Sequence, residues 1–433
     1  MKLPEKTYET YIEILKQELV PAMGCTEPIA IAYCAAKARS ILGELPEKIE
    51  IHASGNIIKN VKSVIVPHTG GLRGMEAAAA AGAFCGQESK GLEVLSGVTE
   101  DQINQLPGYM EKVQFVVSPL ESSHALDLKV AVYFGGHNAA VHIVDEHTNI
   151  LSIEQDGQCI WEKAESVSEG EKETPGYDLL QVEDIVTFAD EARISDVEAV
   201  LRRQIDYNTA IAKEGMEKDY GARIGKVLKS QGSDIRVQAK ALAAAGSDAR
   251  MSGCELPVVI NSGSGNQGLT ASLPVVAYAE HYGKTKEELY RALLVSNLVT
   301  LHLKSGIGRL SAYCGAVSAG AGAGAGIAYL LTGDENQVKH TIVNALAITS
   351  GIVCDGAKAS CAAKIAMAVD AGILGFEMYQ QGNQFRGGDG LVRKGIENTI
   401  ANICCLAHDG MKETDKTIIE LMCDDRKHSA PRC

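Results

Sequence analysis

Residues 165–176, "ESVSEGEKETPG", divide the sequence into two parts of different character. The segment is charged and polar and closes with Pro-Gly, a composition that favours a linker over a helix or a strand. β-Branched runs with near-alternation of apolar and polar residues precede it, whereas nearly every later segment has a helical pattern. We therefore predict an α+β domain over residues 1–170, followed by a predominantly α-helical domain over residues 171–433.

The strand signals lie between residues 47 and 160 or so. They are "KIEIHAS", "NVKSVIVP", "KVQFVVS", "DLKVAVYFG" and "AAVHIVDEHTNILSIEQDG", separated by Gly, Pro, Asn and Asp. An Ala-rich helix, "GMEAAAAAGAFCG", interrupts them, and residues 5–20 and 28–42 are predicted to be helices ahead of them. This order predicts a mostly antiparallel sheet with accompanying helices.

The composition excludes several partners. The chain has 433 residues and a formal net charge of −14, whereas nucleic-acid and anionic-membrane surfaces need basic patches. The first twenty residues lack the apolar core of a signal peptide, and the most apolar run, residues 311–333, is mostly Gly and Ala and is predicted to be a buried helix. We expect a cytoplasmic protein with a small-molecule substrate and no nucleic-acid or membrane partner, and a homo-oligomer is compatible with this composition.

Four of the twelve cysteines lie in unusual surroundings. Cys25 lies in "PAMGCTEP" just before a predicted helix, whose positive end is expected to stabilise a thiolate and lower the cysteine pKa. Cys314, Cys354 and Cys361 lie on glycine-rich turns with the spacing C-x39-C-x6-C. Three thiolates suit an iron–sulphur cluster that keeps one iron open. Two alternatives stay open: a zinc site, although no His lies near these cysteines in the sequence, and three buried packing cysteines.

A glycine-rich loop, "NSGSGNQG" (residues 261–268), is a candidate anion site because its backbone N–H groups can converge on a ligand. It matches no phosphate or dinucleotide motif, so we predict that it binds a substrate carboxylate, with Arg250 as a clamp and Asp248 as its orienting partner. The loop candidates are Asn261, Ser262, Gly263, Ser264, Gly265, Asn266 and Gln267. Asn56, Lys59 and His137 of the strand region are expected to face the same cleft, where the two domains meet.

These motifs resemble the L-cysteine desulfidase family and, more distantly, the iron–sulphur L-serine dehydratase α chain. The resemblance runs from "PAMGCTEP" to "TDKTIIELM" and includes "SDARMSG", "NSGSGNQGLTASLPV", "RLSAYC", "CDGAKASC" and "IANIC" in this order. It implies a cytoplasmic, oxygen-sensitive lyase with a 4Fe–4S cluster that splits L-cysteine into pyruvate, ammonia and sulphide. On this sequence it implies Cys25 as proton acceptor and Cys314, Cys354 and Cys361 as cluster ligands.

Two other functions stay open at this point. L-Serine dehydration needs the same residues and differs only in its leaving group, water in place of sulphide. A non-catalytic iron–sulphur sensor would normally carry an output module such as a basic DNA-binding helix pair, and the sequence contains no such pattern. In the dehydratase relatives a C-terminal cysteine can occupy the open iron. Cys433 is the candidate here, although we expect a disordered tail.

Overall fold

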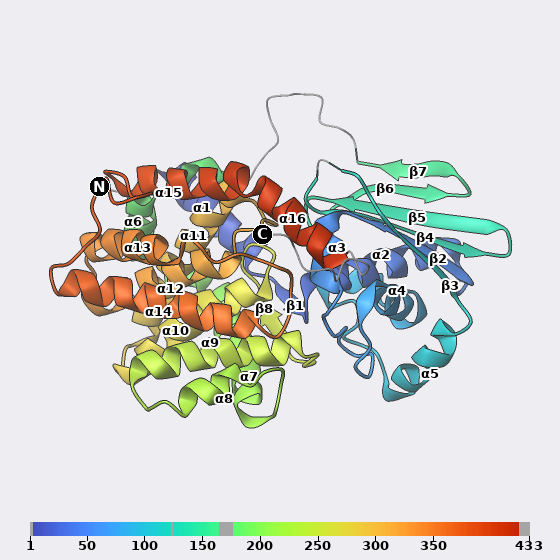
Figure 1. Ribbon diagram of the computed structural model, residues 1–433, viewed down its shortest axis with the longest axis horizontal. Coiled ribbons are helices and arrows are strands. Elements are labelled where there is room, and N and C mark those ends of the chain that lie inside the picture. Colours follow the sequence, from blue (N-terminus) through green and yellow to red (C-terminus); the bar gives the residue numbers. More distant parts are fainter. Residues whose placement is uncertain (1–2, 123, 164–175, 424–433) are drawn as a thin grey trace, which may run out of the picture.

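The protein consists of a sheet region and a helical region that lie side by side (Figure 1). The computed structural model describes residues 3–122, 124–163 and 176–423. Of the predicted linker, 165–176, only Gly176 lies within the described residues, and Cys433 lies outside them as well. The domain boundary at residue 170 therefore stays a prediction.

The sheet has six strands in the order β3-β2-β4-β5-β6-β7. Only β2 and β3 are parallel, and the other neighbours are antiparallel, which confirms the predicted α+β class with a mostly antiparallel sheet. The strands are β2 (Lys48–Ala53), β3 (Gln114–Pro119), β4 (Asp127–Phe134), β5 (His137–Val144), β6 (Ile150–Gln155) and β7 (Gln158–Glu162). The run "NVKSVIVP" is not one of them. Its first residues end a helix, and Val64 and Val66 are buried in the turn that follows.

Helices cover one face of this sheet (Figure 1). They are α2 (Thr26–Leu42), α3 (Gly55–Val61), α4 (Gly74–Cys85), the short 3-10 helix η1 (Glu88–Glu93) and α5 (Glu100–Met110). The alternating residues Ile49, Ile51, Val130 and Val132 are fully buried and form one core with the alanines of α2 and α4. Because successive side chains of a strand point to opposite faces of the sheet, every second residue packs against the helices.

The helical region is built around the glycine-rich helix α12. Its elements are α1 (Glu5–Glu18), η2 (Tyr177–Leu179), α6 (Val182–Glu191), α7 (Ile194–Glu217), α8 (Ile224–Lys229), α9 (Ile235–Met251), α10 (Gly265–His281), α11 (Lys286–Ile307), α12 (Gly315–Thr332), α13 (Glu335–Thr349), α14 (Cys361–Gln380), α15 (Ile396–Cys405), the π-helical turn η3 (Leu406–Gly410) and α16 (Lys412–Cys423). Helix α12 is long and apolar enough to cross a membrane, but most of it is buried inside the protein, as predicted for a core helix.

Glycines let α12 approach its neighbour α14 at backbone distance. A Cβ added to Gly320 would lie 2.4 Å from the carbonyl oxygen of Ala368, and one added to Gly324 would lie 2.6 Å from that of Gly372. Any larger residue at these two positions would force the helices apart.

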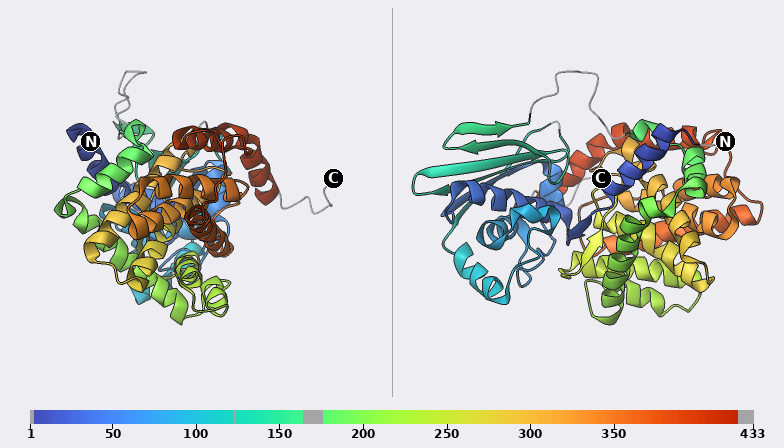
Figure 2. Two further views of the ribbon diagram at one scale, coloured as in Figure 1. Left: turned by 90° about the vertical axis from the view of Figure 1, so that its left-hand side faces the viewer. Right: turned by 180° about the vertical axis from the view of Figure 1, so that it is seen from behind.

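Three segments join the two regions. Helix α1 precedes the sheet in sequence, yet its Tyr11 and Leu15 are buried in the core of the helical region. Figure 2 shows this N-terminal helix, in dark blue, beside the other helices of that region. The short strand β1 (Pro21–Met23), which follows α1, pairs antiparallel with β8 (Pro257–Val259) of the helical region. At the other end of the chain, α16 returns to α3, where Asp415 forms a 2.6 Å ion pair with the buried Lys59.

Candidate functional site

A cavity of about 110 Å³ lies where the sheet region and the helical region meet. The sheet region contributes Cys25, Glu27, Asn56, Lys59, Asn60 and His147. The helical region contributes, among others, Arg250, Ser262, Gly263, Ser264, Asn266, Gln267, Lys304, Arg309, Cys314, Cys354, Gly356 and Cys361. All four cysteines singled out in the sequence therefore line one pocket.

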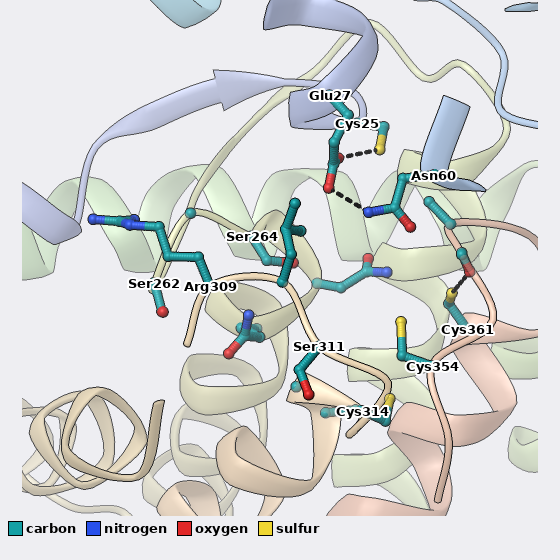
Figure 3. Close-up of a pocket in the computed structure, with 18 of the residues that line it drawn as sticks. Cys25, Glu27, Asn60, Ser262, Ser264, Arg309, Ser311, Cys314, Cys354 and Cys361 are labelled. Carbon is teal, nitrogen blue, oxygen red and sulfur yellow. Dashed lines mark hydrogen bonds between the residues drawn. The ribbon is translucent and has the colours of Figure 1, made fainter. Parts of the chain in front are cut away.

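Cys314, Cys354 and Cys361 share one side of this pocket (Figure 3). The amide of Cys314 donates to the carbonyl oxygen of Ile352 at 3.2 Å, and the amide of Cys354 donates to that of Ala312 at 2.6 Å. This short antiparallel bridge places Cys314 and Cys354 on neighbouring strands of chain, and Cys361 is the first residue of α14. Backbone hydrogen bonds and a helix start therefore fix the three thiols.

The turn between Cys354 and Cys361 depends on Gly356. Its φ of +91° lies in the region that favours glycine, and an added Cβ would lie only 2.5 Å from the carbonyl oxygen of Lys59. The missing side chain thus lets the cysteine turn approach α3 of the sheet region.

The three thiols fit a cluster better than a single metal ion. Within residues 3–122, 124–163 and 176–423, no group of three His, Cys, Asp or Glu side chains could hold one ion. Cluster ligands bind different irons and lie farther apart. Burial raises the pKa of Cys314 to about 12, with a further contribution from Cys354, so metal binding would have to displace its proton. All three donors are sulphur, the ligand type of iron–sulphur clusters.

Cys25 lies on the opposite side of the pocket and is paired with a carboxylate (Figure 3). Its Sγ donates a 2.9 Å hydrogen bond to Glu27 Oε2, and Asn60 Nδ2 donates to Glu27 Oε1 at 2.8 Å. Burial, followed by the charge of Glu27, raises the Cys25 pKa well above its ordinary value. The expected low-pKa thiolate is therefore wrong for this structure, because desolvation and Glu27 outweigh the helix N-terminus.

Arg250 is a buried cation without a direct ion pair, although it lies near enough to Glu27 to help lower the pKa of that carboxyl. It is 3% exposed, and it forms no hydrogen bond or ion pair with any described residue. Next to it, α10 begins at Gly265, and the first amides of a helix have no partner within the helix. The buried Oδ1 of Asn266 and Oε1 of Gln267 also lack partners among the described residues. Such a set of unsatisfied polar groups is typical of a site for a small zwitterion or carboxylate.

The helical part of this pocket lies within a segment that matches a known family. Residues 89–420, which include Arg250, the glycine-rich loop and the cysteine trio, match the model described as "Serine dehydratase alpha chain". The chain belongs to the serine dehydratase alpha chain family. Membership in this family indicates a lyase-type enzyme, and members typically use iron–sulphur clusters.

Individual relatives cover almost the whole chain. A UPF0597 protein of Desulfitobacterium hafniense is 56% identical over 98% of both chains. UPF0597 proteins of Lachnoclostridium phytofermentans and Treponema denticola are 50% and 46% identical, over 96% and 98% of this chain and 99% and 100% of theirs. This serine dehydratase-like chain therefore matches these relatives over 96–98% of its length.

Several predicted substrate residues of the serine dehydratase-like chain do not reach the pocket. Asn261 is fully buried behind the loop, where its side chain donates to Asn297. Gly265 is not a pocket-lining residue. Its missing side chain leaves room for Arg250, since an added Cβ would lie 2.3 Å from Arg250 Nε. Asp248 accepts from the amide of Gly225 and does not orient Arg250.

Of the three sheet-region residues predicted to face the cleft, two line the pocket and one does not. Asn56 lines the pocket, and its buried Oδ1 has no partner among the described residues. Lys59 also lines the pocket, but Asp415 already neutralises its ammonium group. His137 is wrong as a pocket residue, because its 74% exposed side chain pairs with Asp156 at the hairpin between β4 and β5.

Three lining residues of this serine dehydratase-like chain were not predicted from the sequence: Glu27, His147 and Lys304. Glu27 is two residues from Cys25, a separation that would have suggested a carboxylate–thiol pair. Burial lowers the pKa of His147, which is 5% exposed and has no sequence signal. Burial also lowers the pKa of Lys304 to about 8. Its signal was a single charge in the apolar run "LLVSNLVTLHLK".

Proposed function

We propose that the protein is a cytoplasmic 4Fe–4S lyase that degrades L-cysteine to pyruvate, ammonia and sulphide. The supporting observation is the pocket itself, where a buried Arg250 without a direct ion pair lies with three thiols and Cys25. The resemblance of the whole sequence to L-cysteine desulfidases supports cysteine as the substrate. The small cavity of about 110 Å³ supports a small amino acid over a peptide.

Arg250 and the start of α10 would bind the substrate carboxylate. A guanidinium group and a carboxylate form paired, charge-assisted hydrogen bonds, which fix the orientation of the substrate as well as its position. The side-chain oxygens of Asn266, Gln267 and Asn56 are acceptors without described partners and suit the substrate ammonium group.

Cys25 and Glu27 together would move the Cα proton. The resting thiol of Cys25 holds a proton and donates it to Glu27 in a hydrogen bond, so it accepts a second proton only after its own has passed to Glu27. We therefore assign the proton-acceptor role to the Cys25–Glu27 pair, with Asn60 holding the carboxylate in place.

Cys314, Cys354 and Cys361 would hold the cluster through their thiolates. When bound, a cluster with an open iron supplies a Lewis acid that withdraws electron density and assists departure of sulphide. Loss of the Cα proton and of sulphide leaves aminoacrylate. Its imine tautomer takes up one water and yields pyruvate and ammonia, so atoms balance without an oxidant or reductant.

L-Serine dehydration is the second candidate. The match to the serine dehydratase alpha chain family favours it, and the proposed carboxylate, ammonium and proton-transfer groups serve either substrate. The two reactions differ in the atom that leaves Cβ, and this difference decides the experiment.

The test is anaerobic purification followed by parallel assays with L-cysteine and L-serine. We expect a protein that contains iron and acid-labile sulphide and releases pyruvate and sulphide in equal amounts from L-cysteine. A higher kcat/KM with L-serine would select the second candidate. A cluster-loaded protein that produces pyruvate from neither amino acid would contradict both.

A further inference from the structure

Lys304 of α11 is a buried cation whose positive charge is not balanced by an acidic side chain among the described residues. It is 3% exposed and lines the pocket. The hydrogen bond it makes is a long one, 3.5 Å from Nζ to the carbonyl oxygen of Arg309, and no carboxylate in the described part of the chain pairs with it. Burying a charge without a partner costs several kcal/mol in a protein interior. A group absent from the polypeptide alone would offset this cost.

Two cysteines of the trio, Cys314 and Cys354, lie near Lys304 in the same pocket lining. The groups whose negative charge would stabilise the Lys304 ammonium are Cys354, Cys314 and, outside the pocket lining, Cys404. Arg309, a nearby cation, already has acidic partners. Arg309 donates to Glu18 at 2.8 Å and to Glu146 at 3.1 Å.

Two further lysines near the trio are also committed elsewhere. Lys358 and Lys364 both form ion pairs with Asp355. Thiolates that are buried, as at Cys314, or partly buried, as at Cys354 and Cys361, are stabilised by a positive charge inside the protein. Lys304 is the lysine of this set that lies in the pocket lining without an acidic partner among the described residues.

We propose that Lys304 is a positioning residue that compensates the negative charge of the group held by Cys314, Cys354 and Cys361 and donates N–H hydrogen bonds to its sulphur atoms. This inference rests on the proposed function, because it requires the cluster to bind. Such outer-shell donors hold ligands in place and set the potential of a centre through its charge.

The test compares Lys304→Met with wild type and with Lys240→Met, a matched control. Lys240 is a largely buried lysine, with 13% of its side chain exposed, but it lies outside the pocket lining and pairs with Asp370. Each protein is reconstituted anaerobically with iron and sulphide, and its iron content, its loss of iron to a chelator and its reduction potential are measured. We expect Lys304→Met to lose iron about tenfold faster, the lower end of the usual outer-shell effect. We also expect its reduction potential to become more negative, because the reduced cluster carries more negative charge. Lys240→Met should match wild type.

Lys304→Arg covers the case in which the Met variant does not fold, because it keeps the charge. Arginine should retain iron better than Lys304→Gln, as judged in variants with wild-type circular dichroism. Wild-type iron loss and potential in Lys304→Met would overturn the inference. So would a raised KM with an unchanged cluster, which would make Lys304 a substrate ligand. A wild-type protein that takes up no iron would instead contradict the proposed function.

Discussion

The Cys25 thiol donates a 2.9 Å hydrogen bond to Glu27, and the two side chains are only 2% and 7% exposed. The charge of Glu27 and the hydrogen bond both raise the Cys25 pKa, in addition to the larger effect of burial. The pair is therefore a single proton-holding unit in the wall of the pocket.

Glu27→Gln should lower the Cys25 pKa and reduce turnover. Removal of the negative charge leaves burial as the main cause of the raised pKa, so the thiolate should form at lower pH than in wild type. The measurement is alkylation of Cys25 by iodoacetamide against pH in the cluster-free protein, followed by peptide mass spectrometry. Glu146→Gln is the control. An unchanged alkylation midpoint would show that Glu27 does not govern Cys25.

Cys25→Ser should retain the cluster and lose activity. We expect normal iron content and visible absorption, with kcat lower by about a hundredfold or more, the scale of a lost general base. If the iron is lost together with the activity, Cys25 is a ligand and its assignment as proton acceptor fails.

Cys354→Ala should lose most bound iron and all activity while the sheet region stays folded. The proposed ligand Cys354 lies on a turn and not in the sheet core, so the far-ultraviolet circular dichroism should change little. Cys159→Ala, on the exposed strand β7, is the control and should keep both iron and activity. Full iron content in the Cys354 variant would refute the ligand set.

Arg250→Lys should raise KM without changing iron content. Lysine keeps the positive charge but cannot form the paired hydrogen bonds of a guanidinium group with a carboxylate. A lost hydrogen bond to a charged group costs about 1.5–3 kcal/mol, so KM should rise roughly tenfold to a hundredfold. Arg193→Lys, at an exposed site, is the control. A fall in kcat at unchanged KM would place Arg250 outside carboxylate binding.

Asp370 of α14 should make stability depend on pH. Arg236 Nε and Lys240 Nζ of α9 lie 2.9 and 3.0 Å from Asp370 Oδ1. Burial raises the Asp370 pKa, but the hydrogen bonds from Arg236 and Lys240 outweigh burial and lower it. The stabilisation is therefore present above the unfolded pKa of about 3.9 and is lost as pH falls through the lower folded value.

Melting temperatures of cluster-free wild type and Asp370→Asn test this dependence. The variant should melt lower at pH 7, and the difference should shrink as pH falls below about 4. Glu413→Gln removes an exposed ion pair with Lys416 and should have little effect at any pH. A difference that stays constant down to strongly acidic pH would contradict the assignment.

The sheet could be predicted where one face of a strand is buried. In β4, Leu128, Val130 and Val132 are fully buried in alternation, and the sequence shows the same period. Strand β7 was not predicted because all its residues are exposed, so no alternation marks it. The run "NVKSVIVP" was wrongly predicted to be a strand. Its β-branched residues are typical of buried strands, but here Val64 and Val66 are buried in a turn.

The site was predictable in its cysteines and less so in its other groups. His137 is the first residue of strand β5 and lies at an exposed hairpin, whereas His147 follows the end of β5 and lies in the pocket wall. The sequence around these two histidines does not distinguish the exposed one from the buried one. Thr26, next to Cys25, donates a hydrogen bond to the carbonyl oxygen of Gly263 in the glycine-rich loop, a contact between distant segments that gives no local signal in the sequence. Tertiary contacts between distant segments decide these positions.

The backbone contact between α12 and α14 has a consequence for how this site tolerates sequence change. Cys314 is the N-cap of α12, and Cys361 is the first residue of α14. Where Gly320 and Gly324 hold these helices together, a mutation cannot be absorbed by a change of rotamer, as it is in an ordinary core. The distance between Cys314 and Cys361 is thus set by the main-chain contact of the two helices. Substitutions at these glycines would therefore alter the site from a distance.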